Sequence, residues 1–322
     1  MIIAFVNDVF MKGQGVSNVI YQIARRLSEK HEVYVIASES DYEDEKFKVL
    51  RIKARKLLKG SPIKDALSLL PTINKYKKEI MKLDKLYNFD IINVHHSALS
   101  PALVKLKNKT VVTWHGSPPS NFAREGVNRY LVGYLRKFPI TISISEYLAH
   151  QLKEKKINSV VIKEACDKEF KPTHEDNNYM LTVARLVKHK RVDYLIDLAK
   201  KLSFPLHIAG KGTEQQVLQA HSKSIDSPTK FLGYVDDKEL VKQYQRCSFY
   251  LTASEWEGFG LPIVEANSCA KPCIAFDNSN IRDLIKDNIT GYLVSSKQEL
   301  ETSARLLKEN KDLRKQMAKE AS

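Results

Sequence analysis

The sequence has no hydrophobic run long enough to cross a membrane. Hydrophobic residues make up 43% of its 322 residues, yet no apolar stretch reaches the ~18 residues that mark a transmembrane helix. The first ten residues, MIIAFVNDVF, lack the basic start and the cleavage site of a secretory signal and are typical of a buried strand. We therefore expect a globular chain in the cytoplasm, with any membrane contact peripheral and at the inner face.

Cysteine is scarce, and its spacing is not that of a metal site or a disulfide framework. The chain has four cysteines, and no two of them form a C-x-x-C pair. This pattern disfavours a metal knuckle or a disulfide framework and indicates buried thiols in a reducing compartment. The four are Cys166, Cys247, Cys269 and Cys273.

Three common phosphate-binding devices are also missing. The absence of a G-x-x-x-x-G-K-[ST] loop excludes a P-loop nucleotide hydrolase. No Asp-x-Asp occurs, so the carboxylates that would hold a metal-bound diphosphate are absent and no metal site is predicted. The string KGQGVSN (12–18) lacks the third glycine of G-x-G-x-x-G. Gly13 and Gly15 still allow a ligand to approach the backbone at a helix N-terminus, so a ligand loop and a plain tight turn both stay open.

Positive charge is concentrated in one segment of a chain whose net charge is +14. Residues 46–87 hold thirteen Lys or Arg and three acids, a net +10. A solvated helix surface, a surface for anionic lipid, and a surface for nucleic acid or an acidic substrate are the interpretations. No aromatic side chains interleave the run in a pattern that would stack bases, so we expect no nucleic-acid partner.

Apolar runs alternate with helical patterns in two successive series. The first series begins with IIAFVN (2–7) and ends with ITISIS (140–145), and the second begins with YMLTVAR after the polar stretch 171–178. Such βαβ alternation predicts parallel sheets with helices on both faces. We therefore predict an α/β chain of two Rossmann-like domains, residues 1–165 and 166–322, with ligands at the carboxyl ends of the strands.

Two cations follow the first strand of the second series. In VARLVKHKRVDYLI (183–196), Arg185 and Lys190 lie between a strand and a helix N-terminus, where the helix dipole repels positive charge. A bound diphosphate would offset this repulsion, with the arginine as a bidentate donor and the lysine as a point charge. Such cations could replace a metal ion. A solvated basic loop is the alternative.

The string EWEGFGLPIVEA (255–266) predicts a site for sugar and phosphate together. Gly258 and Gly260 let the backbone approach a ligand, and the proline that follows suits the first turn of a helix with free N–H groups. Glu257 precedes this turn and Glu265 lies about one turn inside the helix. Each carboxylate can accept two hydrogen bonds from a vicinal diol. The acids can thus hold the two sugars of a nucleotide sugar, with amides and cations on its phosphates.

One histidine ends a strand of the first series. His115 closes TVVTWH (110–115), so it lies at the edge of the sheet where ligands bind. A structural histidine is the alternative interpretation.

These motifs together resemble the retaining GT-B glycosyltransferases of family 4 (glycosyl transferases group 1). SEWEGFGLPIVEA (254–266) is similar to their E-x7-E signature, and ARLVKHK (184–190) to their G-R-L-x-x-x-K segment. The resemblance covers nearly the whole chain, with IAGKG, TWHG, ISISEYLAHQL and DLIKDNITGYLV as further similar segments. It implies two Rossmann-like domains whose parallel sheets face each other across a cleft.

The resemblance also implies a role for each candidate residue. Glu257 would bind the donor sugar and Glu265 the ribose diol, while Arg185 and Lys190 would bind the diphosphate and stabilise the leaving group. His115 would lie near the transferred sugar and the acceptor. The remaining donor-binding positions are Gly13, Gly15, Tyr234, Val235, Gly258, Phe259, Gly260 and Leu261, of which Tyr234 and Val235 would meet the base.

The activity implied is transfer, with retention, of a sugar from a UDP- or GDP-sugar to a hydroxyl of a glycan or a lipid-linked acceptor. No metal or other cofactor is expected. The basic segment 46–87 would lie in the acceptor domain and contact anionic lipid. A sugar-nucleotide epimerase of the same two-domain design is an alternative, as is a basic nucleic-acid-binding protein.

The chain departs from the family pattern in three places. Its first loop has Gly13-Gln14-Gly15 where Gly-Gly is frequent. At the interdomain linker it has Glu164-Ala165-Cys166-Asp167 where Asn-Gly-Val-Asp is frequent. It also stops at KENKDLRKQMAKEAS, before the helix that usually returns to the first domain, so a short or truncated C-terminus is expected.

Overall fold

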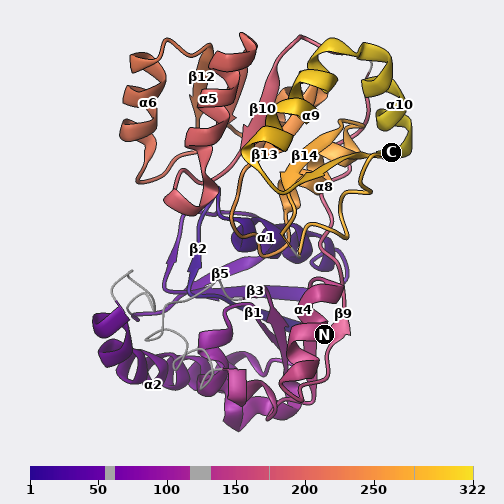
Figure 1. The fold of residues 1–322 in the computed structure, drawn as a ribbon. Coiled ribbons are helices and arrows are strands. Elements are labelled where there is room, and N and C mark those ends of the chain that lie inside the picture. Colours follow the sequence, from indigo (N-terminus) through magenta and orange to yellow (C-terminus); the bar gives the residue numbers. More distant parts are fainter. Residues whose placement is uncertain (55–61, 117–131, 174, 279, 322) are drawn as a thin grey trace. The chain divides into compact units, whose positions relative to one another are not determined.

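The computed structural model describes residues 1–54, 62–116, 132–173, 175–278 and 280–321. The chain divides into two compact units, Met1–Glu164 and Ala165–Ser322 (Figure 1). The sequence placed the boundary one residue later. Each unit has its own parallel sheet, and each is described separately below.

The N-terminal unit contains a seven-stranded parallel sheet with the order β5-β3-β1-β6-β7-β8-β9. Its strands are short, and their central residues are buried because helices cover both faces. A two-stranded parallel pair, β2 with β4, extends beyond the ends of β1 and β3. The bounds are β1 Ile2–Val6, β2 Val9–Phe10, β3 Glu32–Ala37, β4 Glu39–Ser40, β5 Lys48–Arg51, β6 Ile91–Val94, β7 Thr110–Trp114, β8 Ile140–Ser143 and β9 Val160–Val161.

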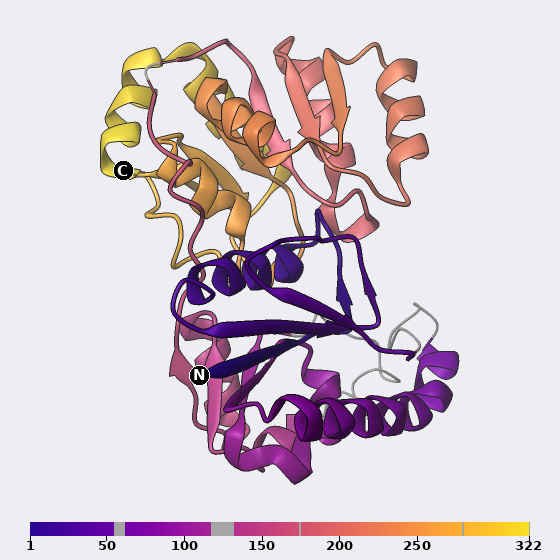
Figure 2. The same ribbon diagram turned by 180° about the vertical axis from the view of Figure 1, so that it is seen from behind.

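Helices α1 and α2 lie on opposite faces of this sheet, as Figures 1 and 2 show from two sides. Helix α1 packs Ile20 and Ala24 into a core with Phe5 and Val35 of the sheet. The helices of this unit include α1 Gly15–Leu27, α2 Pro62–Tyr87, the 3-10 segment η1 Ser97–Lys109 and α4 Glu146–Glu154, and residues 132–135 are also helical.

The C-terminal unit contains a six-stranded parallel sheet with the order β12-β11-β10-β13-β14-β15. Strand β10 pairs with β11 on one side and with β13 on the other. The loops after β10 and β13 therefore start from neighbouring strands. The bounds are β10 Met180–Val183, β11 Leu206–Ala209, β12 Thr229–Gly233, β13 Phe249–Thr252, β14 Cys273–Phe276 and β15 Gly291–Val294.

Two hydrophobic cores cover the two faces of this second sheet. Leu195 of α5, Leu218 of α6 and Leu300 of α9 belong to one core, whereas Tyr244 of α7 and Ile263 of α8 belong to the other. The helical segments are η2 Lys188–Lys190, α5 Val192–Leu202, α6 Gln215–Ser224, α7 Asp237–Arg246, α8 Leu261–Ser268, α9 Lys297–Glu309 and α10 Lys311–Ala321.

The predicted fold class, two α/β units with parallel sheets, is confirmed. Every strand predicted from an apolar run is present within two residues of its expected limits. The two-residue strands β2, β4 and β9 were not predicted, because so short a pairing leaves no hydrophobic pattern. Part of the basic segment, residues 55–61, lies outside the described residues.

No helix among the described residues is long and apolar enough to span a membrane.

Candidate functional site

The loop after β10 is closely packed against the loop after β11. Leu186 donates its N–H to the Lys211 carbonyl, and its own carbonyl accepts from Glu214 N, both at 3.0 Å. A Cβ on Gly210 would lie 2.0 Å from the Ala184 carbonyl oxygen, and one on Gly212 would lie 2.1 Å from that of Leu186. The two glycines of IAGKG are thus required for this approach of two backbones, and their contact fixes the course of the cationic loop.

Arg185 and Lys190, the two predicted phosphate ligands, differ in their surroundings. The Arg185 residue is exposed, and its side chain forms no hydrogen bond or ion pair with the described part of the chain. Lys190 ends η2, and its Nζ lies 2.6 Å from Oε1 of Glu257. The two side chains are only 14% and 16% exposed. The structure therefore brings together a predicted phosphate ligand and a predicted sugar ligand.

The cationic loop and the E-x7-E loop are tied by further contacts beside this pair. Glu255 N donates to the His189 carbonyl at 2.9 Å, and Arg191 Nη1 lies 3.1 Å from Oε1 of Glu255. Burial, followed by the charges of Lys190 and Arg185, lowers the pKa of His189. Both predicted cations therefore act on one histidine, which places their charges in one region of the unit.

The turn between the two glutamates has the backbone that its glycines predict. Gly260 adopts φ +98°, and a Cβ there would meet Leu284 Cδ1 at 3.1 Å. Phe259 is buried and anchors the turn in the unit. The N–H groups of 258–261 have no hydrogen-bond partner among the described residues, so the turn and the α8 N-terminus leave donors free for an anion.

Glu265, the second acid of the signature, is buried within α8. The residue is only 8% exposed, and this burial raises the pKa of its carboxyl to about 7. The interaction of the carboxyl with Tyr244 partly opposes the rise in pKa. The carboxyl is therefore poised to change its charge near neutral pH when a polar ligand reaches it.

The predicted base-binding residues follow β12. Tyr234 is 46% exposed, and Val235 is half-buried. Gly233 before them adopts φ +68°, and its carbonyl accepts from Gly210 N at 2.7 Å. This bond links the loop after β12 to the loop after β11, next to the cationic loop. A role in base binding remains a prediction.

The glycine loop of the N-terminal unit is exposed at the start of α1. Gly13 adopts φ +76°, and a Cβ on Gly15 would have nothing within 4 Å. Packing inside the unit therefore does not require a glycine at position 15. Close approach of a ligand to Gly15 stays a prediction.

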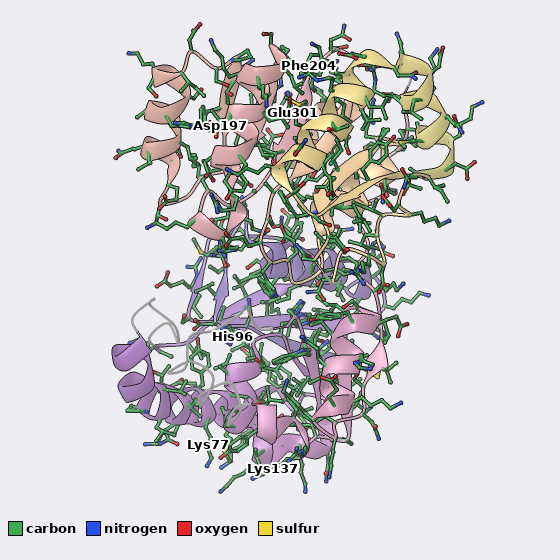
Figure 3. All side chains as sticks on the ribbon, in the orientation of Figure 1. Lys77, His96, Lys137, Asp197, Phe204 and Glu301 are labelled. Carbon is green, nitrogen blue, oxygen red and sulfur yellow. The ribbon has the colours of Figure 1, made fainter. Side chains whose placement is uncertain are left out.

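His115 follows β7 and lies in a chain of three titratable groups. Its Nδ1 is 3.0 Å from Oε1 of Glu164, and its Nε2 is 2.9 Å from Nδ1 of His95. Both ring nitrogens are thus occupied by protein partners. His96, labelled in Figure 3, follows His95 at the carboxyl end of β6 and is influenced by the charges of Asp8 and His115.

Sequence reasoning missed four residues of this cluster: Asp8, His95, His96 and Glu164. Three of them follow the carboxyl ends of β1 and β6, which is where the fold rule already directs the search. Glu164 could not be found in this way, because it lies three residues beyond the two-residue strand β9 and contacts a histidine 49 positions earlier.

No group of three or more His, Cys, Asp or Glu side chains among the described residues could hold a metal ion. All four cysteines are free.

Comparison with known proteins extends the resemblance seen in the sequence. The profile of "Glycosyl transferases group 1" matches residues 164–322, and that of "Glycosyltransferase Family 4" matches residues 13–170. An uncharacterized glycosyltransferase of Methanocaldococcus jannaschii is 29% identical over 255 residues, which are 76% of this chain and 72% of that protein.

Solved structures show the same fold over the entire chain. Sucrose-phosphate synthase of Thermosynechococcus elongatus has a TM-score of 0.86 at 16% identity and covers 100% of this chain and 93% of its own. HepE of Anabaena, in complex with UDP and glucose, has a TM-score of 0.77 at 19% identity, with coverage of 100% and 93%.

The matching profiles and relatives favour a glycosyltransferase over an epimerase or a nucleic-acid-binding protein. The chain belongs to the GT-B glycosyltransferases of family 4, the glycosyl transferases group 1.

Proposed function

We propose that the protein transfers a sugar from a nucleoside diphosphate sugar to an acceptor hydroxyl, with retention of the anomeric configuration and without a metal ion. The observation that carries this proposal is the Lys190–Glu257 pair, 2.6 Å apart, beside a turn whose N–H groups have no partner among the described residues. A phosphate ligand and a sugar ligand in direct contact are what a site for a sugar phosphate requires, because the two chemical groups are adjacent in the donor.

The diphosphate would be held by three kinds of donor in the C-terminal unit. Lys190 supplies a point charge, exposed Arg185 can present two parallel N–H groups, and the turn at 258–261 supplies backbone N–H groups. These charges stabilise the nucleoside diphosphate as it leaves. This supports transfer without a metal, and activity in the presence of EDTA tests it.

The two glutamates would hold the sugars on either side of the diphosphate. Glu257 would accept hydrogen bonds from hydroxyls of the transferred sugar once Lys190 turns toward phosphate. Glu265 would accept from the ribose diol, and the two hydroxyl donors would compensate for burial of its charge. Tyr234 and Val235 would meet the base, and a UDP- or GDP-sugar is the donor we favour. HepE, which binds UDP and glucose, supports the former.

Retention would follow from a front-face reaction, in which the acceptor attacks the sugar on the same face from which the leaving group departs. The donor phosphate then takes the acceptor's proton, so no protein nucleophile is required.

A donor panel followed by product analysis tests this function. Thermal unfolding is measured with UDP-, GDP-, ADP- and TDP-sugars, since a ligand at 100 times its Kd stabilises by ~2.7 kcal/mol. The stabilising donor is then incubated with glycan and lipid-linked acceptors in EDTA, and the anomeric configuration of the product is read by NMR. Free epimerised sugar, an inverted linkage, or activity that EDTA abolishes would each contradict the corresponding part of the proposal.

We further propose that the acceptor is lipid-linked and is reached at an anionic membrane surface. On α2, where Figure 3 labels Lys77, two acids of the basic segment are already paired: Glu79 with Lys75 at 3.5 Å and Asp84 with Lys109 at 2.6 Å. The exposed cations without an acidic partner among the described residues extend onto η1, which packs against α2. They are Lys78, Lys82, Lys85, Lys105 and Lys107.

Liposome flotation tests the membrane contact. Binding to vesicles with anionic lipid should exceed binding to neutral vesicles and should fall with salt, because each basic residue near such a surface contributes ~1 kcal/mol. Replacing Lys78, Lys82 and Lys85 by Gln should weaken binding by about 100-fold. The equal change in charge at exposed Lys223, Lys230 and Lys238 serves as the control, and equal losses in both variants would contradict a specific surface.

A further inference from the structure

Glu164, His115 and His95 form a continuous chain of contacts in the N-terminal unit. Glu164 Oε1 lies 3.0 Å from His115 Nδ1, and His115 Nε2 lies 2.9 Å from His95 Nδ1. The His115 and Glu164 side chains are 12% and 9% exposed, and His95 is buried. The residues come from the ends of β6 and β7 and from the segment after β9, so the chain of contacts is assembled by the fold.

The carboxylate at one end determines where the proton of His115 lies. An ionised carboxylate only accepts hydrogen bonds, so the 3.0 Å separation of Glu164 Oε1 and His115 Nδ1 favours the tautomer with the hydrogen on Nδ1. In the neutral ring Nε2 then has a lone pair, which accepts the Nδ1–H of His95.

The neighbouring groups leave Glu164 as the acid that acts on His115. Asp8, after β1, accepts a hydrogen bond from buried Tyr76 of α2 at 2.8 Å and interacts with His96. Burial lowers the pKa of His96 and, together with the neighbouring charge of His115, holds the pKa of His95 well below its usual value. His95 therefore stays neutral and acts as a hydrogen-bond donor.

We propose that Glu164 and His95 are positioning residues that hold His115 as the Nδ1–H tautomer, so that its Nε2 accepts a hydrogen bond from a hydroxyl of the substrate. His95 occupies Nε2 in the state described here, and the hydroxyl takes its place. This inference rests on the proposed function, because a glycosyltransferase brings sugar hydroxyls to the carboxyl ends of these strands. An imidazole oriented by a carboxylate is also the arrangement that fixes the acceptor nitrogen in hydrolytic triads.

A second histidine–glutamate pair in the same unit provides the contrast. His150 and Glu154 lie 3.5 Å apart on one face of α4, and their side chains are 74% and 64% exposed. Such a surface pair contributes little to stability and does not fix the tautomer of its histidine. Glu164, by contrast, has lost most of its hydration, and its Oε1 lies 3.0 Å from His115 Nδ1.

The tautomer of His115 is measured by NMR of the full chain labelled with ¹⁵N-histidine, with His115→Gln to assign the signal. The wild-type ring should show a protonated Nδ1. In Glu164→Gln the new amide can donate to Nδ1, so the ring should change to the Nε2–H tautomer. In His95→Gln the glutamine faces Nε2 of His115 instead of Nδ1, so the His115 ring should keep its Nδ1–H. Glu154→Gln, the matched surface variant, should leave the His115 signal unchanged.

Kinetics then separates a positioning role from a structural one. Glu164→Gln should lower kcat by about 10-fold, the effect of losing one oriented hydrogen bond to the substrate, with little change in the donor KM. Glu154→Gln should match the wild type. An unchanged tautomer in Glu164→Gln would overturn the inference even in an active enzyme. A protonated Nδ1 in a chain that transfers no sugar would support the tautomer and overturn the proposed function.

Discussion

At the scale of single residues, the Lys190–Glu257 pair shows how the donor site is held without a ligand. Each charge neutralises the other at 2.6 Å, so Lys190 attracts a phosphate less strongly than a free lysine would. A donor that brings both phosphate and sugar hydroxyls supplies new partners for both side chains at once. A free nucleoside diphosphate supplies a partner for Lys190 alone and leaves Glu257 without one.

This difference predicts opposite effects of one substitution. Glu257→Gln should bind the free nucleoside diphosphate more tightly, by about fivefold if release of the pair contributes ~1 kcal/mol. Transfer should fall by about 100-fold or more, because the acceptor of the sugar hydroxyls is weakened. Titration calorimetry and initial rates measure the two quantities. Glu255→Gln, which breaks the exposed contact to Arg191, is the control, and weaker diphosphate binding in Glu257→Gln would refute the pairing argument.

Glu265 predicts a dependence of stability on pH. Its pKa is raised from 4.5 to about 7 by burial, so folding favours the protonated carboxyl. Its stabilising contribution is therefore complete below pH ~4.5 and is lost as the pH rises through ~7, by about 3 kcal/mol in total. Between pH 5 and pH 8, the free energy of unfolding of the wild type should fall by about 2 kcal/mol relative to Glu265→Gln. Urea unfolding at both pH values measures this difference, and a wild type that gains relative stability would show the opposite sign.

The signature residues could be predicted at this scale, but their pairing could not. Glu257, Glu265 and Gly260 are close in sequence, so their spacing around a turn and a helix start already describes their local structure. Lys190 and Glu257 are 67 positions apart, and no local pattern shows that two loops meet. Likewise, no local pattern predicts the contact between Glu164 and His115, because they are far apart in the sequence.

At the scale of elements, the site depends on loops that follow adjacent strands of a parallel sheet. The order β12-β11-β10-β13 places the loops that carry Gly233, Gly210, Arg185 and Glu257 side by side. The strands were predicted well because a strand covered on both faces is a continuous apolar run. The order of the strands has no such signature, and only the structure supplies it.

Close packing of these loops predicts a steric effect at Gly212. Its Cβ would lie 2.1 Å from the Leu186 carbonyl oxygen, and a backbone atom cannot rotate away as a side chain does. Gly212→Ala should therefore destabilise the C-terminal unit by about 2 kcal/mol and displace the cationic loop. Gly15→Ala, whose Cβ would meet nothing within 4 Å, should retain wild-type stability. Denaturant unfolding compares the two, and equal stabilities would contradict the close approach.

At the scale of the molecule, each unit has its own sheet and core, and α10 is fastened to the second unit by a buried ion pair. Arg314 is buried, and its Nη2 lies 2.7 Å from Oδ2 of Asp176. It also donates to the Leu307 and Lys308 carbonyls. Although burial opposes it, hydrogen bonds from Ser248 and Arg314 lower the pKa of Asp176. The last helix is thus joined to the start of the unit by one side chain.

Removing this guanidinium should destabilise one unit and leave the other unchanged. Arg314→Met leaves Asp176 without its counter-charge and should cost about 3 kcal/mol, as for other broken buried pairs. The chain has two tryptophans, Trp114 in the first unit and Trp256 in the second, so Trp114→Phe and Trp256→Phe backgrounds report each unit separately. The transition seen by Trp256 should move to lower denaturant, whereas the one seen by Trp114 should stay. Lys315→Met, which breaks an exposed pair with Asp312, should move neither, and an equal shift of both reporters in Arg314→Met would show that the two units unfold as one.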